Sequence, residues 1–110
     1  MSGIPAKVRR VVLERADGRC EGCGETRPLE LHHRKFRSRG GKHTVPNVLA
    51  LCGWGNQTGC HGDAHSAAPP AGWAVHSWED ETALPFRSRD DRWWFLTADG
   101  RRQLCADPLF

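Results

Sequence analysis

Four cysteines are the feature that most limits how this 110-residue chain can fold. Cys20 and Cys23 have the C-x2-C spacing of half a zinc site, and Cys52 and Cys60 are the candidates for the other half. Four thiolates complete a tetrahedral shell, so such a site is structural rather than catalytic. A chain this short buries only a modest core, and the binding energy of the ion would then stabilise the fold. The sequence therefore predicts a structural zinc site.

The spacing of the second pair and the cellular compartment both affect this interpretation. Seven residues separate Cys52 from Cys60, which is longer than usual, but Gly53 and Gly59 flank the segment and would let it bulge outward. No apolar run is long enough to span a membrane and no signal-peptide core is present, so we expect a cytosolic protein, in which disulfides are rare. The alternative is that Cys52 is a small apolar residue at a strand end. Cys105 has no spaced partner and is predicted to be uninvolved.

Hydrophobic patterning predicts an α+β fold that begins with a helix. Residues 5–17 should be helical, because Pro5 suits the first helical position and Gly18 suits a stop. The apolar stripe of this helix consists of Val8, Val11, Val12 and Ala16. Arg15 falls on the stripe, and we expect its stem to lie along the apolar surface with its charged head in water.

The middle of the chain is predicted to form two strands and a short helix, separated by glycine-containing turns. The expected elements are a strand at 29–36, a basic turn at 38–41, a strand at 48–51, a loop at 53–59 and a helix at 61–66. Adjacent residues of a strand point to opposite faces, so His32 and His33 should have different roles. His61 and His65 are four residues apart, which would place both imidazoles on one helix face. Such a pair, with a third ligand from a nearby strand, could hold a divalent metal with open positions for water and substrate.

The remaining residues, 67–110, are predicted to form a Trp-rich β extension packed on a core of residues 1–66. A breaker at 67–72 would separate the two parts, and an Asp-Gly hairpin turn is expected at Asp99-Gly100. The expected strands lie in 73–78, 83–88, 92–97 and 101–104. One face of the Trp93-Trp94-Phe95 strand should fill the core, and stacking of tryptophans on bases is the alternative.

Basic residues are concentrated in the first half of the chain. The net charge is +3, but residues 7–42 contain eleven Lys and Arg against five acids, and no acid lies between residues 34 and 42. A segment of this kind suits a polyphosphate partner, because neutralised phosphates release their counterions. A solvated surface is the alternative interpretation.

Together these motifs resemble the HNH (His-Me finger) endonucleases, and more narrowly the zinc-containing HNH proteins common in bacteriophages. The resemblance covers residues 8–65 and rests on five elements in order: Cys20-x2-Cys23, Leu31-His32-His33-Arg34, Gly40-Gly41, Asn47 to Cys52 and Cys60-His61-x3-His65. It implies a ββα-metal core with a four-cysteine zinc knuckle, an N-terminal helix and a small C-terminal β region. The implied activity is metal-dependent hydrolysis of DNA phosphodiester bonds, in the cytoplasm of a bacterial host if the protein is phage-encoded.

The resemblance also implies roles for individual residues. His33 matches the general base that takes a proton from water, and Asn47 matches the residue that braces the loop so that the base is correctly aimed. The implied ligands of the catalytic metal are His32, His61 and His65. The metal could be Mg²⁺, Mn²⁺, Ni²⁺ or Zn²⁺, and imidazole suits the later transition metals best. Arg34 could clamp a phosphate. The residues expected to hold the DNA backbone nonspecifically are Lys35, Arg37, Arg39 and Lys42.

Two other functions fit part of the sequence. A noncatalytic zinc module that binds nucleic acid explains the cysteines and the basic segment but leaves the paired histidines without a role. A structural zinc domain that docks on another protein, which could be another phage protein, predicts no salt-dependent DNA affinity. His43 and His76 are expected to be ordinary exposed histidines, and Glu79-Asp80-Glu81 a solvated loop. The sequence predicts no membrane partner and leaves the oligomeric state open.

Overall fold

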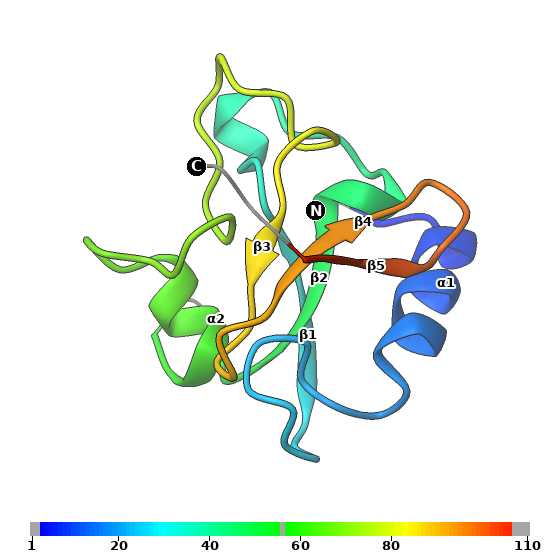
Figure 1. Cartoon of the computed structure of the whole chain (residues 1–110), viewed down its shortest axis with the longest axis vertical. Coiled ribbons are helices and arrows are strands. Elements are labelled where there is room, and N and C mark those ends of the chain that lie inside the picture. Colours follow the sequence, from blue (N-terminus) through cyan, green and yellow to red (C-terminus); the bar gives the residue numbers. More distant parts are fainter. Residues whose placement is uncertain (1–2, 56, 107–110) are drawn as a thin grey trace.

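The computed structural model describes residues 3–55 and 57–106, and it confirms the α+β class (Figure 1). Two helices and two antiparallel sheets are present in this part of the chain, and neither helix is long and apolar enough to cross a membrane. The elements are α1 (Ala6–Ala16), β1 (Leu29–His33), β2 (Val48–Cys52), α2 (Gly59–Ala64), β3 (Phe86–Arg87), β4 (Trp93–Leu96) and β5 (Arg102–Cys105). Residue 56 of the expected loop and residues 107–110 of the expected extension lie outside the described residues.

Strand β2 is at the centre of the molecule and is buried along its whole length. It pairs with β1 in an antiparallel register that sets His33 opposite Val48 and Leu29 opposite Cys52. Because side chains alternate along a strand, β2 supplies residues to two separate apolar clusters. Val48 and Ala50 pack with α1, whereas Leu49 and Leu51 pack with the C-terminal part of the chain. Each of these two leucines stabilises the fold by about 1.5–3 kcal/mol through burial.

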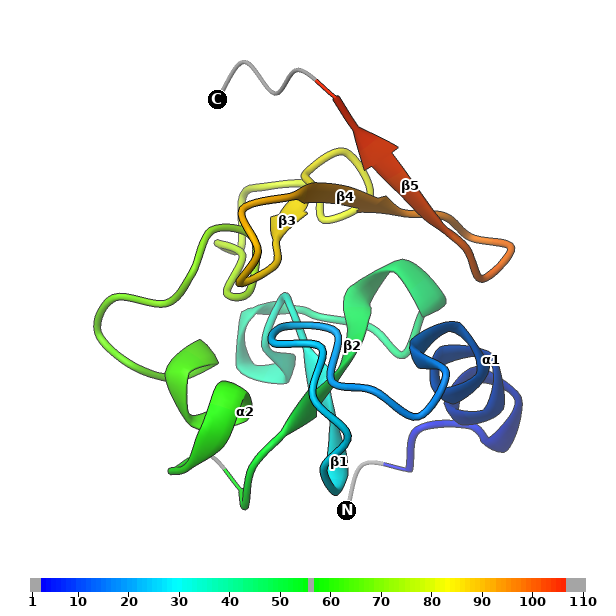
Figure 2. The ribbon, with the colours of Figure 1, turned by 60° about the horizontal axis from the view of Figure 1, so that its bottom comes forward.

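The C-terminal sheet covers the second face of β2, and the two layers are visible in Figure 2. β3, β4 and β5 form an antiparallel sheet in that order, and β4 and β5 form the hairpin expected around Asp99-Gly100. Trp73, Phe86 and Leu96 from this part of the chain share one apolar cluster with Leu49 of β2. The three-stranded sheet therefore has its core in common with the first half of the chain.

The expected strand at 73–78 is absent. Trp73 and Val75 are both buried, but the only pairing in this segment is an isolated bridge between Val75 and Lys35. The expected strand at 83–88 shortens to the two residues of β3, which directly follow Pro85. Proline has no N–H to donate to a ladder, and this accounts for the short strand.

Both ends of helix α1 lie within one residue of the ends predicted from the sequence. Pro5 is the N-cap rather than the first helical residue, and Asp17 ends the helix in the left-handed conformation with φ +54°. The expectation for Arg15 is wrong, because its side chain is only 2% exposed. Its guanidinium forms a bidentate ion pair with Glu21 at 2.7 and 2.8 Å and also donates to the carbonyl of Val45. Glu21 accepts in turn from the backbone N–H of Ala50, so this buried pair ties α1 to β2.

The prediction that Arg34 clamps a phosphate is also wrong. Arg34 is 0% exposed, and its guanidinium donates to four backbone carbonyls, those of Pro46, Gly72, Glu81 and Leu84, at 2.7–3.2 Å. Burial lowers the pKa of Arg34 to about 10, so the group is still a cation at neutral pH. The four carbonyl dipoles replace the water that a buried cation loses. Arg34 therefore joins the end of β1 to the C-terminal part of the chain.

We expect Arg34→Leu to lower the free energy of unfolding by about 3–5 kcal/mol, because it leaves four carbonyls without their donor. Urea unfolding followed by tryptophan fluorescence measures this change. Lys42→Ala, at an exposed position in the same basic segment, is the matched control and should change stability by less than about 0.5 kcal/mol. If Arg34→Leu were as stable as the control and weakened DNA binding alone, the phosphate-clamp interpretation would be restored.

Candidate metal centres

Four cysteines from separate elements meet in one cluster. Cys20 and Cys23 lie in the turn between α1 and β1, Cys52 ends β2, and Cys60 lies in the first turn of α2. Their sulfur atoms all lie within 4.8 Å of one another. The expectation that the four cysteines assemble is confirmed, and this is a donor set that can hold a metal ion.

The seven residues between Cys52 and Cys60 leave the cluster and return to it. Gly53 and Gly59 have φ values of +126° and +62°, and a Cβ on either would collide with backbone at the other end of the segment. Only glycine permits this approach, which explains how a long spacing still brings both sulfurs together. Trp54, within the segment, is 78% exposed.

Hydrogen-bond donors surround the sulfur atoms. The backbone N–H groups of Gly22, Cys23 and Cys52 point at Sγ of Cys20 at 3.3–3.5 Å. The thiol of Cys60, followed by these N–H groups, lowers the pKa of Cys20 to about 4, and the same contact raises the pKa of Cys60. Burial raises the pKa of Cys23 to about 11. The guanidinium of Arg89 lies 3.7 Å from the sulfur of Cys60. Donors of this kind stabilise thiolates, the form in which cysteine binds a metal.

Three histidines form a second cluster. His32 on β1, His61 on α2 and His65 just beyond α2 have ring centroids 5.1 Å apart in each of the three pairs. One nitrogen of each ring lies within 4.8 Å of the others. The expected helix over 61–66 begins and ends two residues earlier, so His65 is its C-cap. The two histidines nevertheless converge on His32, as their spacing indicated.

Two of these imidazoles have one ring nitrogen already engaged. Nε2 of His32 lies 2.6 Å from the carbonyl oxygen of Trp73, and Nδ1 of His61 lies 2.9 Å from a carboxylate oxygen of Glu30. Both oxygens only accept, so these nitrogens carry the protons and leave Nδ1 of His32 and Nε2 of His61 with lone pairs. Metal-binding histidines are commonly oriented in this way. Burial lowers the pKa of His32 to about 3, which keeps its ring neutral.

Sequence reasoning did not find Glu30 or the carbonyl of Trp73. Glu30 lies two residues before His32, and the twofold periodicity of a strand could have placed both on one face. No sequence signal points to the carbonyl of Trp73, which lies 41 residues away along the chain.

His33 points away from this cluster, as the strand alternation predicted, and contacts His43 instead. Nε2 of His33 lies 2.9 Å from Nδ1 of His43, and the ring centroids are 5.0 Å apart. Burial, with the nearby charges of His43 and Arg37, lowers the pKa of His33 below its ordinary value. The ring is therefore neutral at pH 7 and can accept a proton. The expectation that His43 is an ordinary exposed residue is wrong, because it is half-buried against His33.

Asn47 is fully buried and bridges two parts of the loop that follows β1. Its side-chain oxygen accepts from the N–H of Lys35 at 2.7 Å, and its amide donates to the carbonyls of Lys35 and Lys42 at 3.2 and 3.0 Å. These bonds hold the loop at both of its ends.

The basic residues of the loop after β1 differ in exposure and in whether their charged groups already have partners. Arg37 and Lys42 are exposed, and the guanidinium of Arg37 also donates to the carbonyl of Gly41. Lys35 pairs with Glu81 at 3.2 Å, and both side chains are only 14% exposed, so the acidic loop at 79–81 is not wholly solvated. The guanidinium of Arg39 lies 4.5 Å above the ring of Phe36 and donates to the carbonyl of Val75. His76 is exposed as expected and stacks on Trp78.

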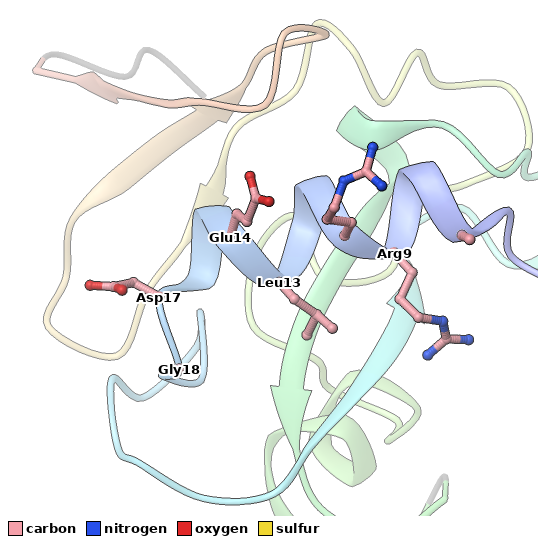
Figure 3. Close-up of a pocket in the computed structure, with 7 residues that line it drawn as sticks. Arg9, Leu13, Glu14, Asp17 and Gly18 are labelled. Carbon is pink, nitrogen blue, oxygen red and sulfur yellow. The ribbon is translucent and has the colours of Figure 1, made fainter.

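A shallow hollow beside α1 is separate from both clusters (Figure 3). It is lined by Ala6, Arg9, Arg10, Leu13, Glu14, Asp17 and Gly18. Leu13 is 38% exposed there. None of these side chains is a cysteine or histidine, so the hollow offers none of the donors found in the two clusters.

Comparison with known proteins identifies one family. Residues 20–66 match the family model described as HNH endonuclease. No curated protein and no solved structure matches the chain. The matched segment contains the four clustered cysteines and the three clustered histidines, together with His33 and Asn47. Residues 20–66 of the chain are therefore similar to the HNH endonuclease family.

Proposed function

We propose that the protein is a metal-dependent endonuclease that hydrolyses DNA phosphodiester bonds, with a ββα-metal centre formed by β1, β2 and α2. The observation that carries the proposal is that two neighbouring histidines at the end of β1 lie in different environments. His32 joins His61 and His65 in a cluster that could hold a metal ion, while the neighbouring His33 has a lowered pKa and lies outside the cluster. A nuclease of this class needs both a metal site and a base.

The histidine cluster fits one divalent cation. Three protein ligands leave open positions for water and substrate, as catalytic sites require. The ion, which would be Mg²⁺, Mn²⁺, Ni²⁺ or Zn²⁺, would supply charge stabilisation for the scissile phosphate and the departing 3′ oxygen. Glu30 and the carbonyl of Trp73 would orient His61 and His32 for this purpose.

His33 would act as the base. Its free nitrogen takes a proton from a water molecule, the hydroxide oxygen forms a bond to phosphorus, and the bond from phosphorus to the 3′ oxygen breaks. The released 3′ oxygen takes a proton from solvent, and His33 returns the proton it accepted to solvent, which restores the base. Asn47 would support this step by holding the loop next to His33.

The cysteine cluster fits a structural zinc ion. Four sulfurs within 4.8 Å of one another close a tetrahedral shell, and the N–H donors around Cys20 favour its thiolate. Arg89 places a positive charge beside Cys60, which would offset part of the negative charge of a four-thiolate site.

The loop after β1 would contact the DNA backbone through Lys42 and Arg37, which are exposed, although Arg37 also donates to the carbonyl of Gly41. Lys35 and Arg39 would contribute less, because Lys35 is paired with Glu81 and Arg39 lies against Phe36. Contacts of this kind set affinity rather than sequence preference.

We expect the zinc-loaded protein to nick supercoiled plasmid when Mg²⁺, Mn²⁺ or Ni²⁺ is added, and His33→Ala to lower kcat by about 10²–10⁴-fold. His76→Ala removes an exposed histidine elsewhere on the surface and should leave cleavage unchanged. Zinc content and circular dichroism check that the variants fold. A wild-type protein that binds DNA without cutting it under any metal would instead be a noncatalytic zinc-stabilised nucleic-acid-binding module.

We expect about one zinc ion per chain to survive dialysis, and Cys60→Ser to lose it together with most of the resistance to thermal unfolding, because metal binding is coupled to folding. Metal analysis and thermal denaturation measure both effects. Cys105→Ser is the matched control, since Cys105 lies in β5 outside the cluster. Equal zinc retention by the two variants would contradict the four-cysteine site.

We expect Lys42→Ala to reduce the slope of log affinity for DNA against log salt concentration by about 0.9, the loss of one phosphate contact. Lys35→Ala should reduce the slope by clearly less, because Glu81 already neutralises Lys35. Fluorescence anisotropy with a labelled duplex across a salt series measures both slopes. Equal slopes for the wild type and Lys42→Ala would exclude Lys42 from the interface.

A further inference from the structure

His43 contacts the proposed base but belongs to neither metal cluster. Its Nδ1 lies 2.9 Å from Nε2 of His33, with the two rings tilted by 50°. It lies in the loop that precedes the short 3-10 turn Val45–Asn47, ten residues beyond His33 in the chain. No spacing motif in the sequence includes it.

The hydrogen bond between the two rings constrains where the proton of His33 can lie. A neutral imidazole has one donor and one acceptor nitrogen. If Nε2 of His33 donates, its Nδ1 has a lone pair and can take a proton from water. If Nε2 of His33 accepts, Nδ1 carries the proton and His33 cannot act as a base. Only the first arrangement is compatible with catalysis, and it requires Nδ1 of His43 to be the acceptor.

We propose that His43 is a positioning residue for the base, whose Nδ1 accepts a hydrogen bond from Nε2 of His33 and so selects the tautomer and ring orientation in which His33 accepts a proton. The inference rests on the proposed nuclease function and deepens it. His43 itself touches no reacting atom. His43 would act like the residues that hydrogen-bond to catalytic histidines in other enzymes and hold them in the correct tautomer and orientation.

The loop around His43 is built to hold that side chain in place. Asn47 donates to the carbonyl of Lys42, the residue directly before His43. Gly41 packs so closely on the carbonyl of Lys35 that a Cβ at this position would collide with it. These contacts hold the loop close to the end of β1, where His33 lies. Asn47 would therefore act on the base through the backbone next to His43.

Two variants separate positioning from simple packing. His43→Ala removes the acceptor. His43→Asn restores one, because the side-chain oxygen of asparagine can occupy nearly the same place as Nδ1. His76→Ala is the control for the loss of a histidine elsewhere. All are made in the full-length, zinc-loaded chain.

Long-range ¹H–¹⁵N spectra of histidine-labelled protein report the tautomer of His33 without any need for activity. We expect the wild type to carry the proton on Nε2 of His33, and His43→Ala to lose this single tautomer. In the plasmid assay His43→Ala should lower kcat by about 10–100-fold with KM unchanged, as loss of an orienting partner does. His43→Asn should recover most of both signals, and His76→Ala should change neither.

Wild-type tautomer and kcat in His43→Ala, with His33→Ala inactive, would overturn this inference and leave the nuclease proposal standing. An Asn variant no better than the Ala variant would overturn it as well, since it would show that His43 acts only through its volume. Absence of cleavage by the wild type with every metal would refute the nuclease proposal, and the positioning role would fall with it.

Discussion

The buried guanidinium of Arg34 connects parts of the chain that the sequence keeps far apart. It follows His33 directly at the end of β1 and donates to carbonyls as distant as that of Leu84. A cation cannot be buried without such partners, so the C-terminal part of the chain must close over this point for the fold to form. The same closure brings the carbonyl of Trp73 to His32. The proposed metal ligand on β1 is thus oriented by a segment outside residues 20–66, which match the HNH model.

The two candidate metal centres are connected through α2. Cys60 and His61 are adjacent in sequence, and each belongs to a different cluster. A helix of only six residues has little stability of its own, because forming the first turn is unfavourable. A zinc ion that holds Cys60 to Cys20 and Cys52 would anchor the start of α2, and His61 and His65 would then be held near His32. In this view the structural site is a condition for the geometry of the catalytic one.

Much of the fold followed from local patterns. Pro5 and Gly18 placed the ends of α1 within one residue, and the separate environments of His32 and His33 followed from strand alternation. The sequence predictions failed where the same local pattern is compatible with two different tertiary structures. The sequence predicts a strand at 73–78, yet Val75 forms only an isolated bridge with Lys35, and the backbone N–H of Trp73 donates to the nearby carbonyl of Pro70. Trp73 and Val75 are both buried without belonging to a ladder.

For the site, the sequence by itself determined which residues could bind metal, because cysteine and histidine side chains are the donors and their spacing survives in the fold. It also determined which face of β1 each histidine would occupy. Only the tertiary structure decided what each charged or polar group would meet. Arg34 faces carbonyls rather than phosphate, and His33 faces His43. A guanidinium or an imidazole is equally suited to either partner, and the choice depends on long-range packing that no local spacing encodes.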